Sequence, residues 1–166
     1  MAESRAFSET LWKAAFDSVK SYFQIHNLMP EQEQAIRAFF ERDDVFVNLP
    51  TGYGKSLIYQ CLPIVADVLY QRPLSSSVVL VISPLKALMA DQVQHLNDLG
   101  IPAVALSDQD DPEILQQVMN GVYLIVFCSP ESVLSTVTGR GILSDAEFQS
   151  RLVGVAVDEA HCIIQW

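Results

Sequence analysis

Apolar residues along this chain alternate between helical spacing and continuous, strand-like runs. Residues 8–26 and the stretch that starts at Pro30 carry apolar side chains every three or four positions, which predicts two amphipathic helices. Short continuous apolar runs indicate strands that are covered on both faces of a sheet. We expect strands at 45–48, 78–82, 122–127 and 152–157, and a shorter one at 103–106.

Helical spacing returns between the predicted strands. We expect helices at 57–70, 85–99, 112–120, 130–137 and 144–150. Pro63 interrupts the first of these, and we expect a kink or a break there because an interior proline removes a hydrogen bond and crowds the preceding turn. Gly139-Arg140-Gly141 has the composition of a flexible turn. Strands that alternate with helices predict an α/β fold, with an open, mostly parallel sheet and helices on both faces.

A glycine-bearing loop, LPTGYGKS at 49–56, stands between a predicted strand and a predicted helix, which is the context of a phosphate site. Gly52 and Gly54 can turn backbone N–H groups inward to form an anion nest. Lys55 supplies positive charge for the outer phosphates of a nucleotide, and the Ser56 hydroxyl can reach Mg²⁺. The alternative is a tight turn with a solvated lysine, because the pattern of such loops begins with glycine where this chain begins with leucine.

An acidic segment, DEAH at 158–161, follows directly after the last predicted strand. Ligands of open parallel sheets bind beyond the carboxyl ends of the strands, so we expect this segment and the glycine loop at the same edge. Asp158 can hold the Mg²⁺ that bridges phosphates, and Glu159 can orient and deprotonate an attacking water. The alternative is an acidic strand end before a helix, a place that carboxylates favour. His161 taken alone is more often a packed or solvated histidine than a catalytic one.

Composition narrows the class of protein. The 166 residues suit one domain, and 50% apolar with 18% charged residues allow a sizeable core. A net charge of −10 argues against a broad basic surface for nucleic acid, although it leaves room for a narrow backbone-contacting groove. The three cysteines show no paired spacing, so neither a zinc site nor a disulfide framework is indicated. No signal peptide or membrane-spanning run is present in the sequence, and we expect a soluble intracellular protein.

Five stretches, taken together, resemble the motifs of the first motor domain of RecQ-family DNA helicases, within helicase superfamily two. They occur in the family's order and cover most of the chain after residue 22. The stretches are PEQEQAI at 30–36, LPTGYGKSLIYQCLP at 49–63, VISPLKALMADQV at 81–93, FCSPESVL at 127–134 and VDEAHCIIQW at 157–166. The family does not keep the first glycine of the loop, and the extension after DEAH distinguishes RecQ-like enzymes from RNA helicases.

The resemblance implies a RecA-like domain that binds ATP and Mg²⁺ and an ATP-dependent DNA helicase activity. It implies that Gln32 reads the adenine edge and that His161 links the nucleotide site to DNA contacts. The phosphate-binding residues would be Thr51, Gly52, Tyr53, Gly54, Lys55 and Ser56, with Ser56 and Asp158 as metal ligands. The catalytic residues would be Lys55, Asp158, Glu159 and His161. The residues along a single strand of DNA would be Ser83, Lys86 and Ser129, although from the sequence alone we favour helix capping and solvation as the explanation of the two serines.

Two features of the sequence depart from the family. Leu28-Met29 replaces a Phe-Arg pair before the proline, and Ile25 replaces an upstream aromatic residue. The resemblance divides the chain into a helical segment at 1–29 and a first RecA-like domain at 30–166, with a second motor domain expected beyond Trp166. It also implies single-stranded or partly duplex DNA as partner, no membrane, and a nuclear location in a eukaryote or a cytoplasmic one otherwise.

Two other classes of protein remain as interpretations of the sequence. One is a non-catalytic nucleotide- or DNA-binding module. The other is a small P-loop kinase or other NTPase, which we disfavour because the stretches at 81–93 and 157–166 have no role in it.

Overall fold

The computed structural model describes residues 6–41, 44–107 and 111–161. The end of the DEAH extension, at 162–166, lies outside these ranges and includes Cys162. Within the described residues, no helix is both long enough and apolar enough to cross a membrane.

The described residues contain a four-stranded sheet in which every pairing is parallel. Its strands are β1 (Val78–Ile82), β2 (Ala103–Ala105), β3 (Ile125–Cys128) and β4 (Leu152–Val157), in the order β2-β3-β1-β4. In the register of the sheet, Leu80 of β1 lies between Val126 of β3 and Val155 of β4. The predicted open parallel sheet is confirmed, and four of the five expected strands form, with β3 starting three residues later than predicted.

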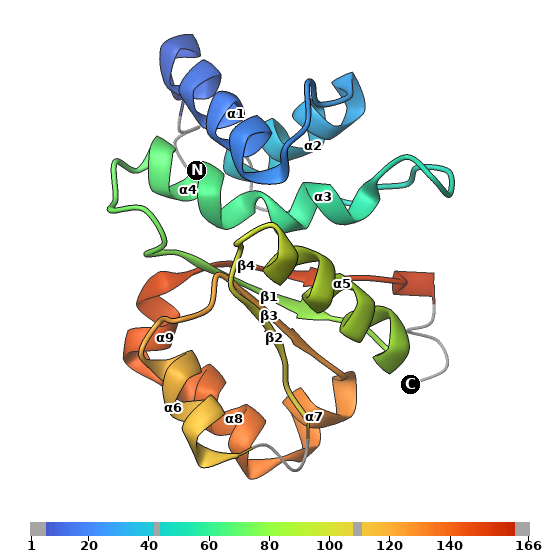
Figure 1. Cartoon of the computed structure of the whole chain (residues 1–166), viewed down its shortest axis with the longest axis vertical. Helices are drawn as coiled ribbons and strands as arrows, with labels where there is room; N and C mark the ends of the chain where they lie inside the picture. The colour runs from blue at the N-terminus through green and yellow to red at the C-terminus, as the bar shows by residue number, and fades with distance from the viewer. Residues whose placement is uncertain (1–5, 42–43, 108–110, 162–166) are drawn as a thin grey trace.

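Within the described residues, helices precede the first strand and occupy most of the chain between the strands. The first five are α1 (Glu9–Phe23), α2 (Pro30–Glu41), α3 (Lys55–Gln60), α4 (Leu62–Leu69) and α5 (Lys86–Asp98). The remaining four are α6 (Pro112–Met119), α7 (Pro130–Ser135), α8 (Val137–Ser144) and α9 (Ala146–Arg151). Figure 1 shows α1 to α4 on one side of the sheet and α6, α8 and α9 on the other.

The two faces of the sheet bury separate groups of apolar side chains. Val79 and Val81 point to the face that packs against α1 to α5, where Trp12, Ile36 and Leu96 are fully buried. The alternate residues of the same strand point to the other face and pack with side chains from α6 to α9. This alternation follows from the two-residue period of a strand and explains why β1 and β3 are apolar throughout.

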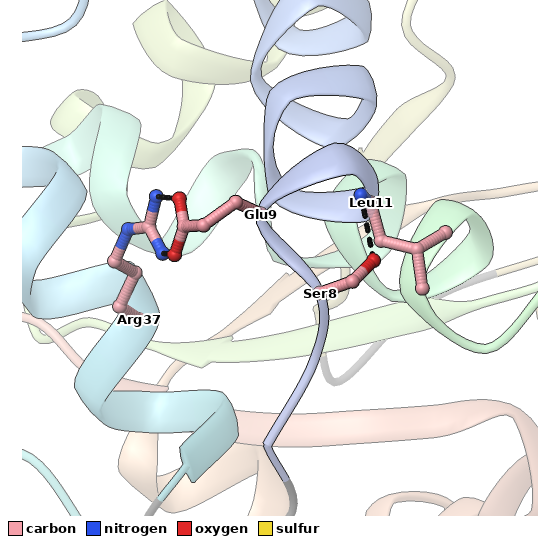
Figure 2. A network of polar contacts seen from close by, with 4 residues as sticks. All are labelled: Ser8, Glu9, Leu11 and Arg37. Atoms are coloured by element: carbon pink, nitrogen blue, oxygen red, sulfur yellow. Dashed lines mark hydrogen bonds and ion pairs between the residues drawn. The ribbon is translucent and has the colours of Figure 1, made fainter.

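The N-terminal helices are joined by one forked ion pair, which Figure 2 shows. Arg37 of α2 donates from both terminal nitrogens to the two carboxylate oxygens of Glu9 on α1, each at 3.0 Å. The hydrogen bond from Arg37 lowers the pKa of Glu9. The same guanidinium lies over the ring of Trp12 at 4.8 Å, and Ser8 caps α1 by accepting from the backbone N–H of Leu11. Helix α1 is therefore fastened to α2 at its first turn.

The predicted break in the helix after the glycine loop is confirmed. Helix α3 ends at Gln60, Cys61 forms the junction, and Pro63 lies in the first turn of α4. A proline is tolerated in the first turn of a helix because the N–H that it lacks would have no partner within that helix.

The prediction of a flexible turn at Gly139-Arg140-Gly141 was wrong, because these residues lie inside α8. Thr136 provides the start signal: its hydroxyl accepts a hydrogen bond from the backbone N–H of Gly139 at 2.9 Å, as an N-cap does. Gly139 is needed for packing, since a Cβ at this position would collide with the backbone carbonyl oxygen of Ser132. The glycine therefore permits close contact between α7 and α8 and does not mark a loop.

The prediction of a strand at 45–48 was also wrong. Residues 44–50 have no regular secondary structure, and Phe46 is 84% exposed. Val47 and Leu49 still pack against the core that faces α1 to α5. A strand exists only where a neighbour completes its hydrogen-bond ladder, and none of the described strands pairs with this segment. The segment therefore leads into the glycine loop as an extended stretch held by side-chain packing.

Candidate functional site

The glycine loop connects the extended segment to α3 and has the backbone shape that the sequence predicts. Gly52 and Gly54 adopt φ values of +88° and +65°, in the region that favours glycine. Tyr53 donates from its backbone N–H to the Pro50 carbonyl at 3.3 Å, which closes a turn. No side chain caps the start of α3, and both Lys55 and the loop are exposed.

Gln32, from the first turn of α2, holds this loop in place. Its side chain is only 4% exposed, and its amide nitrogen donates to the carbonyls of Gly54 at 3.1 Å and Tyr53 at 3.4 Å. Its amide oxygen accepts from the backbone N–H of Met29 at 2.8 Å. A Cβ at Gly54 would lie 2.7 Å from the amide nitrogen. The family resemblance implied an adenine contact for Gln32, whereas no pattern in the sequence predicted this direct contact with the loop.

The acidic segment begins where β4 ends. The backbone N–H of Asp158 donates to the Ile82 carbonyl at 2.9 Å, which fixes it beside the end of β1. Its carboxylate accepts from the backbone N–H of Glu159 at 2.9 Å. Glu159 has a φ of +54°, which is strained for a residue with a side chain, and its carboxylate lies 3.3 Å from Nδ1 of His161. The three candidate residues of the segment therefore form one connected group.

Tyr59 connects α3, the helix that follows the glycine loop, to the acidic segment, and no sequence prediction included this residue. Its hydroxyl lies 2.9 Å from an Asp158 carboxylate oxygen and 2.9 Å from the amide oxygen of Gln92 on α5. Burial raises the pKa of Tyr59 well above its ordinary range, while a hydrogen bond with Ser56 acts in the opposite direction. One signal was available: Ser56 and Tyr59 are three positions apart, which places them on the same face of a helix.

A Mg²⁺ ion fits the chemistry of this junction. Asp158, one of the two predicted ligands, contacts the Tyr59 hydroxyl at 2.9 Å, and Ser56, the other, lies in the same short helix as Tyr59. Hydroxyl and carboxylate oxygens are ligands that Mg²⁺ prefers. Among the described residues, no group of three or more His, Cys, Asp or Glu side chains is arranged to hold a metal. A cation here would therefore depend on water and on the phosphates of a ligand for most of its coordination.

The predicted DNA contacts lie at neighbouring strand ends, but the two serines are covered. Ser83 follows β1, is 2% exposed, and donates from its backbone N–H to the Cys128 carbonyl at 3.0 Å. Its hydroxyl is buried without a hydrogen-bond partner among the described residues. Ser129 follows β3, is 4% exposed and caps α7 by accepting from the Ser132 N–H. Lys86, the first residue of α5, is exposed.

A parallel sheet with helices on both faces, a glycine loop before a short helix, and an acidic residue at a strand end define an α/β domain of the RecA-like type. The chain belongs to the DEAD/DEAH box helicase family, which it matches over residues 29–166. This match confirms the resemblance to a helicase domain that the sequence motifs indicated.

Among curated proteins, the chain is similar to helicases of the RecQ type. It is 34% identical over 160 residues to the ATP-dependent DNA helicase hus2/rqh1 of Schizosaccharomyces pombe, covering 93% of this chain and 12% of the relative. It is 36% identical over 148 residues to the ATP-dependent helicase SGS1 of Saccharomyces cerevisiae, covering 87% and 10%. It is 35% identical over 175 residues to the ATP-dependent DNA helicase RecQ of Haemophilus influenzae, covering 100% and 25%. The chain therefore spans a quarter or less of the length of these relatives.

A solved structure supports the same fold. The DUF1998 helicase MrfA, determined bound to DNA and AMPPNP, superposes with a TM-score of 0.69 over 97% of this chain and 22% of that chain. Its sequence identity to this chain is 22%, so the likeness concerns the fold.

Proposed function

We propose that this chain is the ATP-binding motor domain of a RecQ-like DNA helicase. In that role it couples Mg·ATP hydrolysis to 3′-to-5′ movement along single-stranded DNA and to duplex unwinding, in DNA repair and recombination. The observation that carries the proposal is the 2.9 Å hydrogen bond between Tyr59, in the helix that follows the glycine loop, and Asp158 at the end of β4. A phosphate loop and an acidic strand end are useful together only when one ligand contacts both.

Each residue of the site has a separate role in phosphoryl transfer. Lys55 and the loop amides bind the phosphates, and Ser56 with Asp158 would hold Mg²⁺, which neutralises charge on the phosphates when bound. Glu159 orients and deprotonates the attacking water. The hydrogen-bonding distance between Glu159 and His161 gives His161 a means of orienting that carboxylate. Such reactions depend on positioning and charge more than on covalent chemistry, so this small set of groups suffices on one side of the nucleotide.

Gln32 is proposed to contact adenine at the same time as it holds the loop. Its amide nitrogen is used by the loop, but its oxygen accepts one bond from Met29 and keeps a second lone pair. That lone pair matches the amino group of adenine. With such a contact, the same Gln32 amide would bind both the base and the phosphate loop, so the position of the loop would depend on which base is bound.

DNA is proposed to run along the strand ends that carry Ser83, Lys86 and Ser129. The net charge of −10 favours a narrow path that contacts the backbone of one strand. The exposed Lys86 can provide positive charge to the DNA backbone along such a path. Because the two serines are buried, they can contribute only to the shape of the protein surface beneath it. A second motor domain is expected to complete the enzyme, since an arginine placed against the γ-phosphate contributes roughly 10³–10⁵ in rate where it is used.

Binding of Mg·ATP to purified wild type and Lys55→Ala, measured by titration calorimetry, tests the proposal. Removing a charge-assisted phosphate contact should weaken binding by ~1.5–3 kcal/mol, or roughly 10- to 150-fold in Kd. Lys13→Ala is the matched control, because Lys13 is an exposed lysine on α1, away from the loop. Equal affinities for wild type and Lys55→Ala, or an equal loss in the control, would contradict the phosphate site.

A further inference from the structure

The Tyr59 hydroxyl connects three elements that lie far apart in the sequence. Tyr59 belongs to α3, Asp158 follows β4, and Gln92 lies in the middle of α5. Both acceptors are 2.9 Å from the hydroxyl oxygen. The tyrosine side chain is buried, and its ring packs edge-on against Phe127 of β3 with centroids 6.5 Å apart. The ring is therefore held by packing, and only the direction of the O–H bond is free to change.

A tyrosine hydroxyl carries one proton, so it can donate to only one of the two acceptors at a time. The carboxylate is the stronger acceptor, because a hydrogen bond to a charged group is stronger than one between neutral groups. Gln92 does not lose its partner in that arrangement, since its oxygen also accepts from the amide of Gln60 at 3.2 Å. In the nucleotide-free protein, the network is therefore satisfied with Tyr59 donating to Asp158.

A cation bound to Asp158 would change this preference. Positive charge on the carboxylate oxygen weakens it as a hydrogen-bond acceptor, which leaves Gln92 as the better partner for the Tyr59 proton. The O–H bond then rotates from Asp158 to Gln92, one hydrogen bond replaces another, and no proton leaves the tyrosine. The geometry thus provides two arrangements of one hydroxyl, and the cation selects between them.

We propose that Tyr59 is a positioning residue that holds Asp158 while Mg²⁺ is absent and signals cation binding to α5 through Gln92. The inference rests on the proposed function, because it requires that Asp158 binds Mg²⁺ with a nucleotide. Its consequence is that the Mg·nucleotide state of the site is sensed by α5, the helix whose first residue is the exposed Lys86. Nucleotide state and the proposed DNA path are then linked by a single side chain.

The test compares Tyr59→Phe with Tyr123→Phe in the full chain. Tyr59→Phe keeps the ring and removes only the hydroxyl. Tyr123→Phe is a matched control, because the Tyr123 hydroxyl also donates to a glutamine oxygen, that of Gln117 at 2.7 Å, on the other side of the sheet. Each protein is titrated with Mg²⁺ in the presence of a fluorescent ATP analogue, with a second series in EDTA.

Tyr59→Phe should lower the Mg²⁺ concentration for half-maximal enhancement of analogue binding by roughly fivefold, because the charge-assisted hydrogen bond to Asp158 that the cation must displace is then absent. Its affinity for the analogue in EDTA should equal that of the wild type, because the hydroxyl acts through the cation site. Lys55→Ala should instead weaken binding in both series. Tyr123→Phe should leave both series unchanged.

Amide hydrogen exchange across residues 86–98 provides the second readout. Mg·nucleotide should change exchange in this segment of the wild type and of Tyr123→Phe, and the change should be lost in Tyr59→Phe and in Gln92→Leu. If Tyr59→Phe melts far below the wild type, its loss of the exchange response could reflect unfolding. Gln92→Leu then tests the signalling role, because it removes the contact with α5 and leaves the tyrosine in place.

The possible outcomes separate the inference from the proposed function. A wild type that binds the analogue with a clear Mg²⁺ dependence, together with a Tyr59→Phe titration that matches it, refutes the inference alone. Unchanged hydrogen exchange in α5 of the wild type also refutes the signalling role. Absence of any Mg²⁺-dependent binding by the wild type refutes the proposed function and the inference with it.

Discussion

Replacing Gly54 with alanine should disturb the contact between Gln32 and the glycine loop. Gly54 has a φ of +65°, and a Cβ there would lie 2.7 Å from the Gln32 amide nitrogen. That nitrogen donates to the Gly54 carbonyl at 3.1 Å, so it cannot withdraw without losing the bond. The substitution therefore combines an unfavourable backbone conformation with the displacement of a buried side chain.

The expected cost follows from these two effects. Alanine in the left-handed region costs ~1–2 kcal/mol relative to glycine. Loss of a hydrogen bond from the displaced Gln32 adds ~0.5–1.5 kcal/mol. Gly54→Ala should thus lower the free energy of unfolding by ~1.5–3.5 kcal/mol. Gly52→Ala is the matched control, because Gly52 has a φ of +88° and a Cβ at that position would meet nothing within 4 Å, so only the backbone cost applies.

Urea unfolding of the two variants and the wild type measures the difference, provided that the slope of the transition is unchanged. Gly54→Ala should be the less stable of the two. A Gln32→Ala background should remove the excess, because the clash partner is then absent and Gly54→Ala should cost no more than Gly52→Ala. If the two glycine variants are equally stable, or if the excess persists without Gln32, the contact between Gln32 and the loop does not constrain Gly54 in the way described.

Two further predictions concern the base and the packing of α8. Gln32→Ala should narrow the preference for ATP over GTP in competition against a fluorescent analogue, because it removes the proposed contact with adenine; an unchanged ratio would show that Gln32 only supports the loop. Gly139→Ala should lower the melting temperature, since its Cβ would collide with the Ser132 backbone, whereas Gly141→Ala, with open space around it in the same helix, should stabilise the protein by up to ~1 kcal/mol. Equal effects of the two alanine substitutions would contradict the close packing of α7 on α8.

Local sequence patterns predicted much of the fold. The runs that became β1 and β4 were assigned with the bounds that the structure has, because continuous apolar residues flanked by polar ones have few other stable arrangements. Pro63 correctly indicated the break between α3 and α4, since its effect on a helix depends only on the adjacent turn. The order of the motifs was sufficient to indicate the helicase family that the comparison with known proteins confirmed.

The two wrong predictions both concern segments whose structure depends on a neighbour. The apolar run at 45–48 has the composition of a strand, but no described strand pairs with it. Gly139-Arg140-Gly141 has the composition of a turn, but capping by Thr136 and close packing on α7 make it helical. Hydrogen-bond ladders and helix packing are relations between distant residues, so composition within a short window does not determine them.

The sequence by itself determined which residues are candidates for the chemistry, because a phosphate loop needs glycines, a lysine and a hydroxyl at fixed spacing. Only the tertiary structure decided how they are connected. Gln32 lies 22 positions before Gly54 and Tyr59 lies 99 positions before Asp158, yet both pairs are in hydrogen-bond contact. These contacts arise because α2 packs beside the loop and because parallel strands bring their carboxyl ends to one edge of the sheet. Such placement follows from the packing of whole elements, which no local pattern encodes.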